Sequence, residues 1–510
     1  MIPRYCVLDV LTGNNSCEIF APWSEELGRK PVLQFSLFLV NIFQLPVALA
    51  PNFASIMVGR ALGGLSSAGG SVTLGMIADL WESDNQQFAV AAVVFSSVGG
   101  SVLGPVVGGF TEQYLSWQWS IWIQLILGGF VQLMHLLFVP ETRSTVMMDK
   151  IAKQRRKAHP GLNIWGPNEM VTFRERFAVR ELLVTMLRPF KMFVTEPIVL
   201  TLSLLSGFSD ALIFMFIQSF SLVYKQWGFG TVDVGLSFIP LLVGYCIAWA
   251  VFIPAIKWNQ RKRAENPEDE HIQYESRLYL LLYLAPLLPI GLFGYAWTCT
   301  GPPIHWIGSM IFAILIGVAN YSIYMATIDY MICACKSTPN KFAAQALTIL
   351  DGPYSASATG GNGWARDFLA GVLTVPATPF FSNIGSNPLA YATTILACIS
   401  VLLVAAVYVI YWKGETLRRR SPFAQQLSDA RDDKQETGHD EEMQRVAYTD
   451  AASYGAGTAR PMNRARQRSY QSQRLNENMG SRRGTPRATP GTTPTASRAN
   501  SIVGEKKIVT

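Results

Sequence analysis

The sequence predicts an all-α protein that crosses a membrane many times, and two observations carry this prediction. Of the 510 residues, 50% are apolar, and the mean hydropathy of +0.23 is too high for one soluble domain. Ten runs are long enough to span a bilayer, because a helix needs about 20 mainly apolar residues to cross the hydrocarbon core. One such run is also compatible with a buried core helix, but ten in series leave only a polytopic membrane protein.

The ten runs form a group of four and a group of six, separated by the polar segment 140–196. They cover residues 32–50, 53–78, 88–110, 118–139, 197–220, 232–254, 278–297, 304–328, 357–382 and 389–412. Each run predicts one transmembrane helix.

Loop charge predicts the orientation, because Lys and Arg accumulate on the cytoplasmic side of membrane proteins. Alternate loops hold Arg29 and Lys30, then eleven Lys and Arg within 140–196, then a basic group at 257–263. The opposite loops contain only Lys225. We therefore expect 140–196 and the C-terminus to be cytoplasmic.

Residues 413–510 form a tail with 18 Lys/Arg and 11 Asp/Glu, an excess that equals the formal net charge of the chain, +7. The tail's last part is polar and poor in large apolar residues, so it cannot bury enough surface to fold. Arginine-rich tails also bind nucleic acid, but a disordered cytoplasmic tail near anionic lipid is the preferred interpretation. No nucleic-acid partner is expected.

The stretch 99–110, GGSVLGPVVGGF, is the most informative of the chain. Five of its residues follow the spacing GxxxGPxxGG: Gly100, Gly104, Pro105, Gly108 and Gly109. Glycines four apart let a second membrane helix approach closely, and proline bends the helix. Ordinary GxxxG packing accounts for two or three of these residues. All five together resemble the antiporter motif on the fifth helix of drug:H+ antiporters in the major facilitator superfamily.

The segment APWSEELGRKP (21–31) resembles the same family's loop motif between spans two and three, with Glu25 in place of the common aspartate. The resemblance implies that Gly28 permits a tight turn. It also implies that Arg29 and Lys30 hold cytoplasmic helix ends through carbonyl and carboxylate contacts. A charged loop of this kind is also common in other proteins.

RALGG (60–64) resembles the fourth-span motif, in which Arg60 lies inside the membrane. A charge at that depth is costly and usually faces the bundle interior with a partner. The resemblance implies a role for Arg60 in proton coupling, whereas snorkelling is the alternative. WQWSIWIQ (117–124) and PETR (140–143) resemble the sixth span and its exit.

Together these segments resemble the fungal, twelve-span branch of the drug:H+ antiporters, which includes multidrug and polyamine exporters. The resemblance implies a major facilitator fold, with two pseudo-symmetric bundles around a midplane cavity. It implies proton-coupled export of small amphipathic or cationic compounds by a monomer. The expected partners are a small-molecule substrate, protons and the lipid bilayer. The plasma membrane is the expected location, with the vacuolar membrane as the alternative.

The expected organisation has four parts. Residues 1–139 form an incomplete N-terminal bundle, 140–196 a cytoplasmic central loop, 197–412 a C-terminal bundle, and 413–510 the disordered tail. The two halves of a transporter need such a loop in order to rock against each other.

In the second half, Asp210 lies in the middle of the run LSLLSGFSDALIFMFIQSF. A carboxylate surrounded by hydrocarbon is a candidate for proton exchange or cation binding. A hydrogen bond between packed helices is the alternative. Gln218 lies about two turns further along the same face and is expected to join Asp210.

Asn320, Tyr321 and Tyr324 form a polar and aromatic strip suited to an amphipathic ligand, although tyrosines of a packed core give the same pattern. The resemblance implies a further polar group in spans ten and eleven, which pairs or gates at the cytoplasmic ends: Asp329, Arg366 and Asp367.

No enzyme signature emerges from the sequence. It has no ATP-binding Walker loop and no nucleophile–base pair, so a proton gradient is the expected energy source. Seven cysteines show no disulfide or zinc-binding spacing, and no metal or cofactor is expected. The alternatives are a facilitated or symport carrier, or a membrane protein that does not transport, either a sensor or an inactive truncated product.

The sequence departs from the twelve-span pattern in two places. Residues 1–20 hold Asp9 and Glu18 and make no good span, so we expect a chain truncated by about two spans. Residues 335–351 interrupt a stretch that in the family runs directly into Tyr-Gly-Pro-Tyr. Their codons are compatible with an unspliced intron, and a true loop insertion is the alternative.

Overall fold

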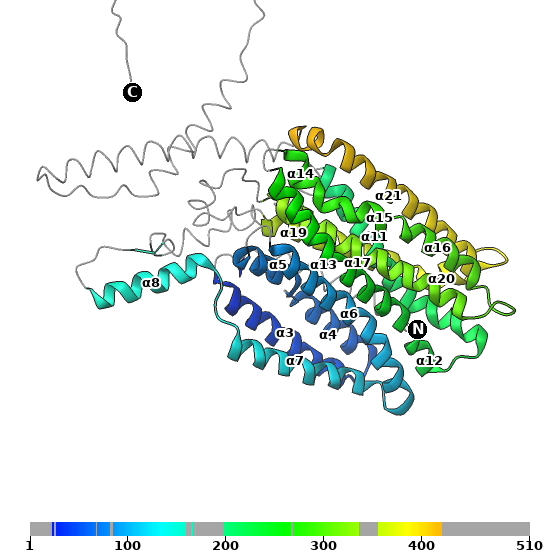
Figure 1. Cartoon of the computed structure of the whole chain (residues 1–510). Helices are drawn as coiled ribbons and strands as arrows, with labels where there is room; N and C mark the ends of the chain where they lie inside the picture. The colour runs from blue at the N-terminus through cyan, green and yellow to red at the C-terminus, as the bar shows by residue number, and fades with distance from the viewer. Residues whose placement is uncertain are drawn as a thin grey trace, which may run out of the picture. The chain divides into compact units, whose positions relative to one another are not determined.

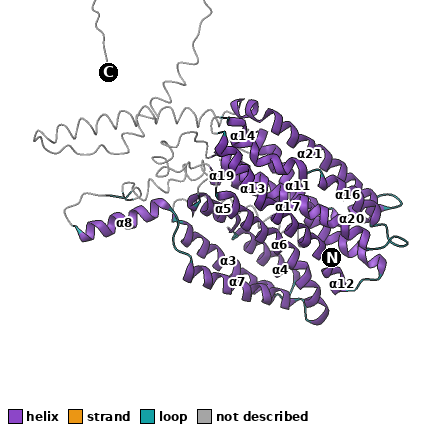
Figure 2. Cartoon of the chain, in the orientation of Figure 1, coloured by secondary structure: helices purple, strands orange, loops and turns teal. Residues whose placement is uncertain are grey.

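The computed structural model describes residues 23–24, 27–67, 69–81, 85–159, 165–166, 169, 197–266, 269–335 and 355–420. Within these residues the regular structure is helical, and no strand occurs (Figure 2). The expectations for the truncated start (1–20), Glu25, the tail beyond 420 and the inserted stretch after Cys335 lie outside the described residues. The all-α prediction is confirmed for the part that the structure describes.

Eight helical stretches of the described chain are long and apolar enough to cross a membrane. They are Arg29–Ala48, Gln86–Tyr114, Gln118–Phe138, Ile198–Trp227, Thr231–Glu265, Ser276–Thr298, Ile307–Met331 and Pro388–Gly414. The individual helices, as drawn in Figure 1, are α3 (Arg29–Ala48), α4 (Phe53–Leu65), α5 (Gly69–Leu80), α6 (Gln86–Tyr114), α7 (Gln118–Phe138), α8 (Ser144–Ala158), α11 (Pro197–Tyr224), α12 (Thr231–Leu236), α13 (Ile239–Glu265), α14 (Glu270–Glu275), α15 (Tyr279–Leu284), α16 (Leu287–Thr298), α17 (Ile307–Cys335), α19 (Ser355–Thr374), α20 (Ala377–Ser382) and α21 (Pro388–Arg420).

The two remaining expected spans are each divided between two shorter helices. The run 53–78 forms α4 and α5, which are interrupted after Leu65 where serines and glycines follow one another. The run 357–382 forms α19 and α20, which are interrupted just before Pro376. Proline has no backbone N–H and disfavours helical conformation in the residue before it, so the helix stops there.

Two groups of helices pack around the polar side chains described below. In the first group α3 packs against α4 and α7, and in the second α11 packs against α19 and α21, and α17 against α13 and α16. Helix α6 joins the two groups, because it contacts α5 and α7 on the side of the first group and α12, α13 and α17 on the side of the second. Most residues of α11 and α17 are buried, so these two helices occupy the centre (Figure 1).

In helix α7, by contrast, Ile121 is the one buried residue, and the helix packs on α3 along one side while the other side is exposed. Its exposed side chains are large and apolar, among them Ile126 (65% exposed), Leu137 (63%) and Phe138 (73%). Contiguous apolar surface of this size is unfavourable in water and natural against lipid. The chain is therefore a multi-pass membrane protein whose α7 faces the bilayer.

Candidate functional site

Asp210 lies beside a second carboxylate and a shared guanidinium. Arg366 Nε lies 3.6 Å from Asp210 Oδ2 and 3.1 Å from Asp367 Oδ1. All three side chains are largely buried, with exposed fractions of 21% for Asp210, 18% for Arg366 and 7% for Asp367. The sequence proposed Asp210 as a site residue and placed Arg366 and Asp367 elsewhere, at a gate; the structure brings the three together.

Helix α17 supports this group from the side. The ring of Tyr324 lies under the Arg366 guanidinium, 4.6 Å from its central carbon to the ring centroid. One turn earlier, Asn320 Nδ2 donates to the backbone oxygen of Ser209 (2.8 Å) and to its hydroxyl (2.9 Å). Because Ser209 precedes Asp210, these bonds fix the turn of α11 that carries the carboxylate.

Several buried polar atoms of the described helices have no hydrogen-bond partner, among them Ser206 Oγ on α11 and Asn362 Oδ1 on α19. Two more are Asn320 Oδ1 on α17 and the hydroxyl of Tyr245 on α13. A buried polar atom without a partner is costly, so such atoms commonly mark the place of water or a ligand. Asn320 and Tyr245 lie on helices that pack against each other in the second group.

The charge of the group is unbalanced when both carboxylates are ionised. Asp210 and Asp367 then carry two negative charges against the single positive charge of Arg366. Removing charges from water is expensive unless they are paired, so the surplus favours one additional cation in this site. A proton or an organic ammonium group can supply that charge. In the part of the chain that the structure describes, no three His, Cys, Asp or Glu side chains gather to hold a metal ion.

Gln218 does not join Asp210, so this expectation is wrong. Its Nε2 donates to the backbone oxygen of Thr374 (3.4 Å), and its Oε1 accepts from the hydroxyl of Thr378 (3.2 Å). Eight residues advance a helix by about 12 Å. Gln218 therefore meets the far end of α19, and Asp210 meets its middle.

Tyr321 lies in the packed core, which is the alternative that the sequence left open for this strip. Its side chain is fully buried, and its hydroxyl donates to the backbone oxygen of Ala91 in α6 (2.9 Å). The ring also packs edge-on against Phe252 at 5.8 Å and Phe95 at 6.5 Å between centroids. Tyr321 thus anchors α17 to α6.

Asp329 pairs with Arg277 and not with Arg366. Arg277 Nη1 lies 2.7 Å from Asp329 Oδ1, and Gln87 of α6 donates its side-chain N–H to the other carboxylate oxygen. Arg263 Nη2 in turn donates to Gln87 Oε1 (3.4 Å). All four side chains are buried, and they connect α6 to α13, to α17 and to the 3-10 turn Ser276–Leu278 that precedes α15.

Sequence reasoning missed Gln87, Arg263 and Arg277 as members of this group. A signal existed, because Gln87 and Arg277 each stand immediately before an expected span, and Arg263 stands in the basic loop on the same expected side. Periodicity within one helix gives no partner for such residues, since the contacts join positions up to 242 residues apart.

The loop of Gly28, Arg29 and Lys30, called the GRK loop below, is held by Glu141 of the PETR segment. Glu141 Oε1 accepts from the backbone N–H of Arg29 (2.9 Å), and Oε2 accepts from that of Lys30 (3.1 Å). Gly28 has a φ of 109° in the left-handed region, and a Cβ there would lie 2.7 Å from Glu141 Oε2. Only glycine fits this turn without strain.

The side chains of the same loop reach two further helices. Arg29 Nε lies 3.1 Å from Asp79 Oδ2 at the end of α5, where Arg143 Nη1 also lies 3.3 Å from Oδ1. Lys30 Nζ donates to the backbone oxygen of Leu136 in α7 (3.0 Å). These are the carboxylate and carbonyl contacts that the resemblance implied for Arg29 and Lys30.

The glycine motif packs differently from the expectation. Side chains built at Gly100, Gly104 and Gly108 would meet nothing within 4 Å, so the expected close approach at Gly104 is wrong for the described chain. A Cβ at Gly109 would lie 3.0 Å from the backbone oxygen of Thr231, the first residue of α12.

The close approach uses another face of α6. A Cβ at Gly235 of α12 would lie 2.9 Å from the backbone oxygen of Pro105 and 3.4 Å from the Cα of Gly109. Pro105 and Gly109 are four residues apart and therefore share one face of α6. This face is rotated by about 100° from the face that carries Gly104 and Gly108. The motif therefore does bring two helices together, through Pro105 and Gly109.

Arg60 lies in α4 and is partly buried. Helix α4 packs on α3 in the first group of helices, whereas Asp210 and its partners lie on α11 and α19 in the second.

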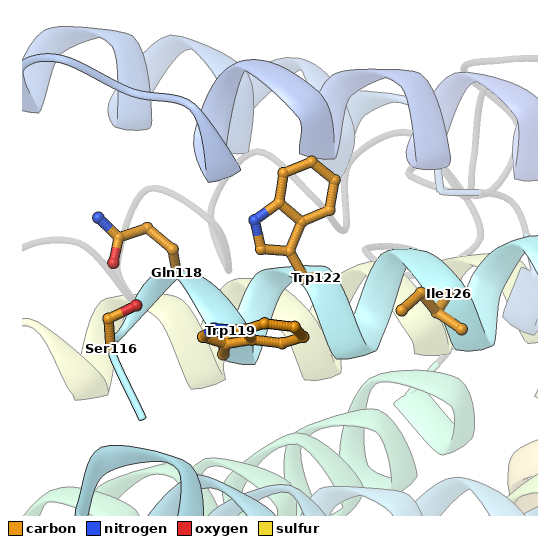
Figure 3. A pocket seen from close by; sticks show the side chains of 5 residues that line it. All are labelled: Ser116, Gln118, Trp119, Trp122 and Ile126. Atoms are coloured by element: carbon orange, nitrogen blue, oxygen red, sulfur yellow. The ribbon is translucent and has the colours of Figure 1, made fainter. Parts of the chain in front are cut away.

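A separate cavity of about 360 Å³ lies at the beginning of α7. It is lined by Ser116, Gln118, Trp119, Trp122 and Ile126, and Figure 3 shows Trp122 pointing away from α7 toward a neighbouring helix. Tryptophans at the end of a span mark the membrane interface. The cavity contains no charged side chain and shares no residue with the Asp210 group.

Comparison with known proteins identifies the family of the chain. Residues 19–351 match the model of the Major Facilitator Superfamily. The chain is 32% identical to the transporter paaT of Penicillium rubens over 80% of this chain and 70% of that protein. It is 31% identical to the transporter kojT of Aspergillus flavus over 79% and 68%, respectively. It is 30% identical to the efflux pump atB of Aspergillus terreus over 80% and 82%. The chain is a membrane transporter that belongs to the Major Facilitator Superfamily.

Proposed function

We propose that this chain exports small amphipathic or cationic compounds from the cytosol in exchange for protons. The observation that supports the proposal is the buried group of Asp210, Arg366 and Asp367, in which one guanidinium faces two carboxylates. The surplus negative charge favours either a proton or an organic cation at one place. Two occupants that compete for one site are what an exchange reaction requires.

Each residue has a role in this proposal. Asp210 carries the exchanged proton, because it is the carboxylate further from Arg366 and the more exposed of the two. Asp367 and Arg366 set the charge of the site, and Asn320 positions α11 through Ser209. Arg60, on α4 of the first helix group, would contribute to proton coupling as a second charge within the membrane.

The proposal extends to the whole chain as the sequence suggested. Bundles 1–139 and 197–412 would rock about a midplane cavity, and 140–196 would link them in the cytoplasm. The disordered tail, expected from residue 413, would begin later, because α21 stays helical to Arg420. We propose a monomer in the plasma membrane, with the vacuolar membrane as the alternative. Export is also the activity named for the relative atB.

The first experiment distinguishes antiport from facilitated transport. The purified full chain is reconstituted in vesicles with an acidic lumen, and uptake of the amphipathic cation rhodamine 6G is followed. Antiport predicts accumulation above the external concentration, because protons leave as the dye enters, and loss of that accumulation with a protonophore. Equilibration without accumulation, indifferent to the protonophore, would favour a facilitated carrier. Vesicles without protein give the background.

A further inference from the structure

We propose that α8 lies along the cytoplasmic membrane surface and binds anionic phospholipid headgroups. Helix α8 follows the span α7 after only the segment Val139–Arg143, and Figure 1 shows it standing away from the packed helices. The connecting segment is held in place because Glu141 accepts from the backbone N–H groups of Arg29 and Lys30. The start of α8 is therefore fixed at the level where α7 leaves the bilayer. This inference does not depend on the transported compound.

One face of α8 is occupied by the chain that follows it. Arg156 Nη2 lies 2.7 Å from Glu169 Oε1, and Lys153 Nζ lies 3.6 Å from the same oxygen. The Arg156 guanidinium also lies over the ring of Trp165, 4.3 Å from its centroid. These contacts give the two cations one shared carboxylate, and they cover Arg156 more than Lys153, whose side chain stays 61% exposed.

Another face of α8 is exposed and apolar. Met147 and Ile151 are 44% and 45% exposed, and they are four residues apart, one above the other on the helix. Ala158, a further seven residues along, is exposed on the same side of the helix, and the exposed polar side chain of Gln154 lies between it and Ile151. No large side chain of the described residues covers this stripe.

Basic side chains border the apolar stripe. Lys150 and Lys157 are exposed along one edge, and Arg155 is exposed beside Ile151 on the other. At 100° per residue, both lysines project within about 80° of the Met147 direction. An apolar stripe between basic edges is the pattern of a helix that lies in the headgroup region.

The charge and the apolar stripe together select the partner. An acidic protein segment would satisfy the three bases but would leave Met147 and Ile151 in water. A zwitterionic bilayer would cover the stripe but would offer the bases no net charge. An anionic lipid surface does both, and near such a surface each base strengthens binding by about fivefold.

The test is hydrogen–deuterium exchange of the full chain in nanodiscs of phosphatidylcholine alone or with 30% phosphatidylserine. We expect backbone N–H groups of residues 147–158 to exchange at least tenfold more slowly with phosphatidylserine. The triple variant Lys150→Glu, Arg155→Glu, Lys157→Glu should lose that difference. Arg261→Glu, at an exposed base on α13 outside the stripe, is the matched control and should keep it.

Three results would overturn the proposal. Equal exchange in both lipids would mean that α8 does not recognise anionic headgroups. If the triple variant kept the difference in exchange between the two lipid compositions, basic residues other than Lys150, Arg155 and Lys157 would be responsible for it. Equal protection in both lipids that disappears in high salt would assign α8 to an acidic segment of protein. Unchanged exchange of α11 and α17 in each variant shows that the fold is intact.

Discussion

Gln87 of α6 donates a hydrogen bond to Asp329 of α17, and this bond joins the two groups of helices at the end where Arg277 and Arg263 are buried. The ion pair beside it is short, 2.7 Å between Arg277 Nη1 and Asp329 Oδ1, and almost fully buried. Because both charges are shielded from water, each depends on the other for its stabilisation. We therefore expect a substitution of either residue to lower the stability of the protein strongly.

Removal of the Asp329 carboxylate should destabilise the protein markedly. Asp329→Ala removes the carboxylate that binds both Arg277 and Gln87, and loss of one partner of a buried ion pair costs about 3–5 kcal/mol. Thermal unfolding in detergent should show this as a large drop in Tm. The double variant Arg277→Met, Asp329→Leu should be more stable than the single one, since it removes both charges of the buried pair. Equal Tm values for Asp329→Ala and the parent chain would contradict the assignment.

The glycine motif gives a paired prediction on α6. Gly109→Leu should prevent the packing of α6 on α12, because a Cβ at Gly109 already lies 3.0 Å from the Thr231 backbone oxygen. Gly104→Leu is the matched control, since nothing lies within 4 Å of a side chain there. Detergent-solubilised Gly109→Leu should aggregate or unfold at lower temperature than Gly104→Leu. The reverse order would show that the close contact is at Gly104 after all.

The turn at Gly28 should tolerate no side chain. Gly28→Ala combines a φ of 109° with a contact of 2.7 Å to Glu141 Oε2, and strained backbone of this kind costs about 1–3 kcal/mol. Gly69→Ala is the comparison, because it adds the same methyl group with nothing within 4 Å. We expect a lower Tm for Gly28→Ala alone. Indistinguishable Tm values would mean that Glu141 does not hold this turn.

The loop charges give a topological prediction for intact cells. A tag at Thr510 should survive protease added outside, because 140–196 and the tail are expected in the cytoplasm. The same tag should be cleaved after permeabilisation. Cleavage in intact cells would reverse the orientation and would also remove the basis for α8 on the cytoplasmic leaflet.

Apolar runs predicted where helices form, because a run of about 20 such residues has few stable alternatives in a membrane. The glycine before Arg29 and the carboxylate and carbonyl partners of the GRK loop also followed from a local motif. The pairing of polar residues did not. Gln218 and Asp210 lie in the same apolar run but contact different turns of α19. Asp329 pairs with Arg277, and the spacing of residues within one helix does not reveal such a partner.

The Pro105 and Gly109 face illustrates the same point within one motif. Spacing identified five residues that favour close packing, but the neighbouring helix decides which of the faces is used. That neighbour, α12, is a six-residue helix far along the chain that carries Gly235 opposite Gly109. Complementary surfaces of this kind arise only when both helices are in place.

The most direct test of the coupling proposal is gradient-driven uptake by Asp210→Asn. Asparagine keeps the shape of the side chain and removes the exchangeable proton. The accumulation of rhodamine 6G in vesicles with an acidic lumen should therefore fall at least tenfold. Asp269→Asn is the matched control, because Asp269 Oδ1 accepts from Ile272 N–H at an exposed helix start, where asparagine caps equally well. Accumulation by Asp210→Asn equal to that of the parent chain would contradict proton coupling through Asp210.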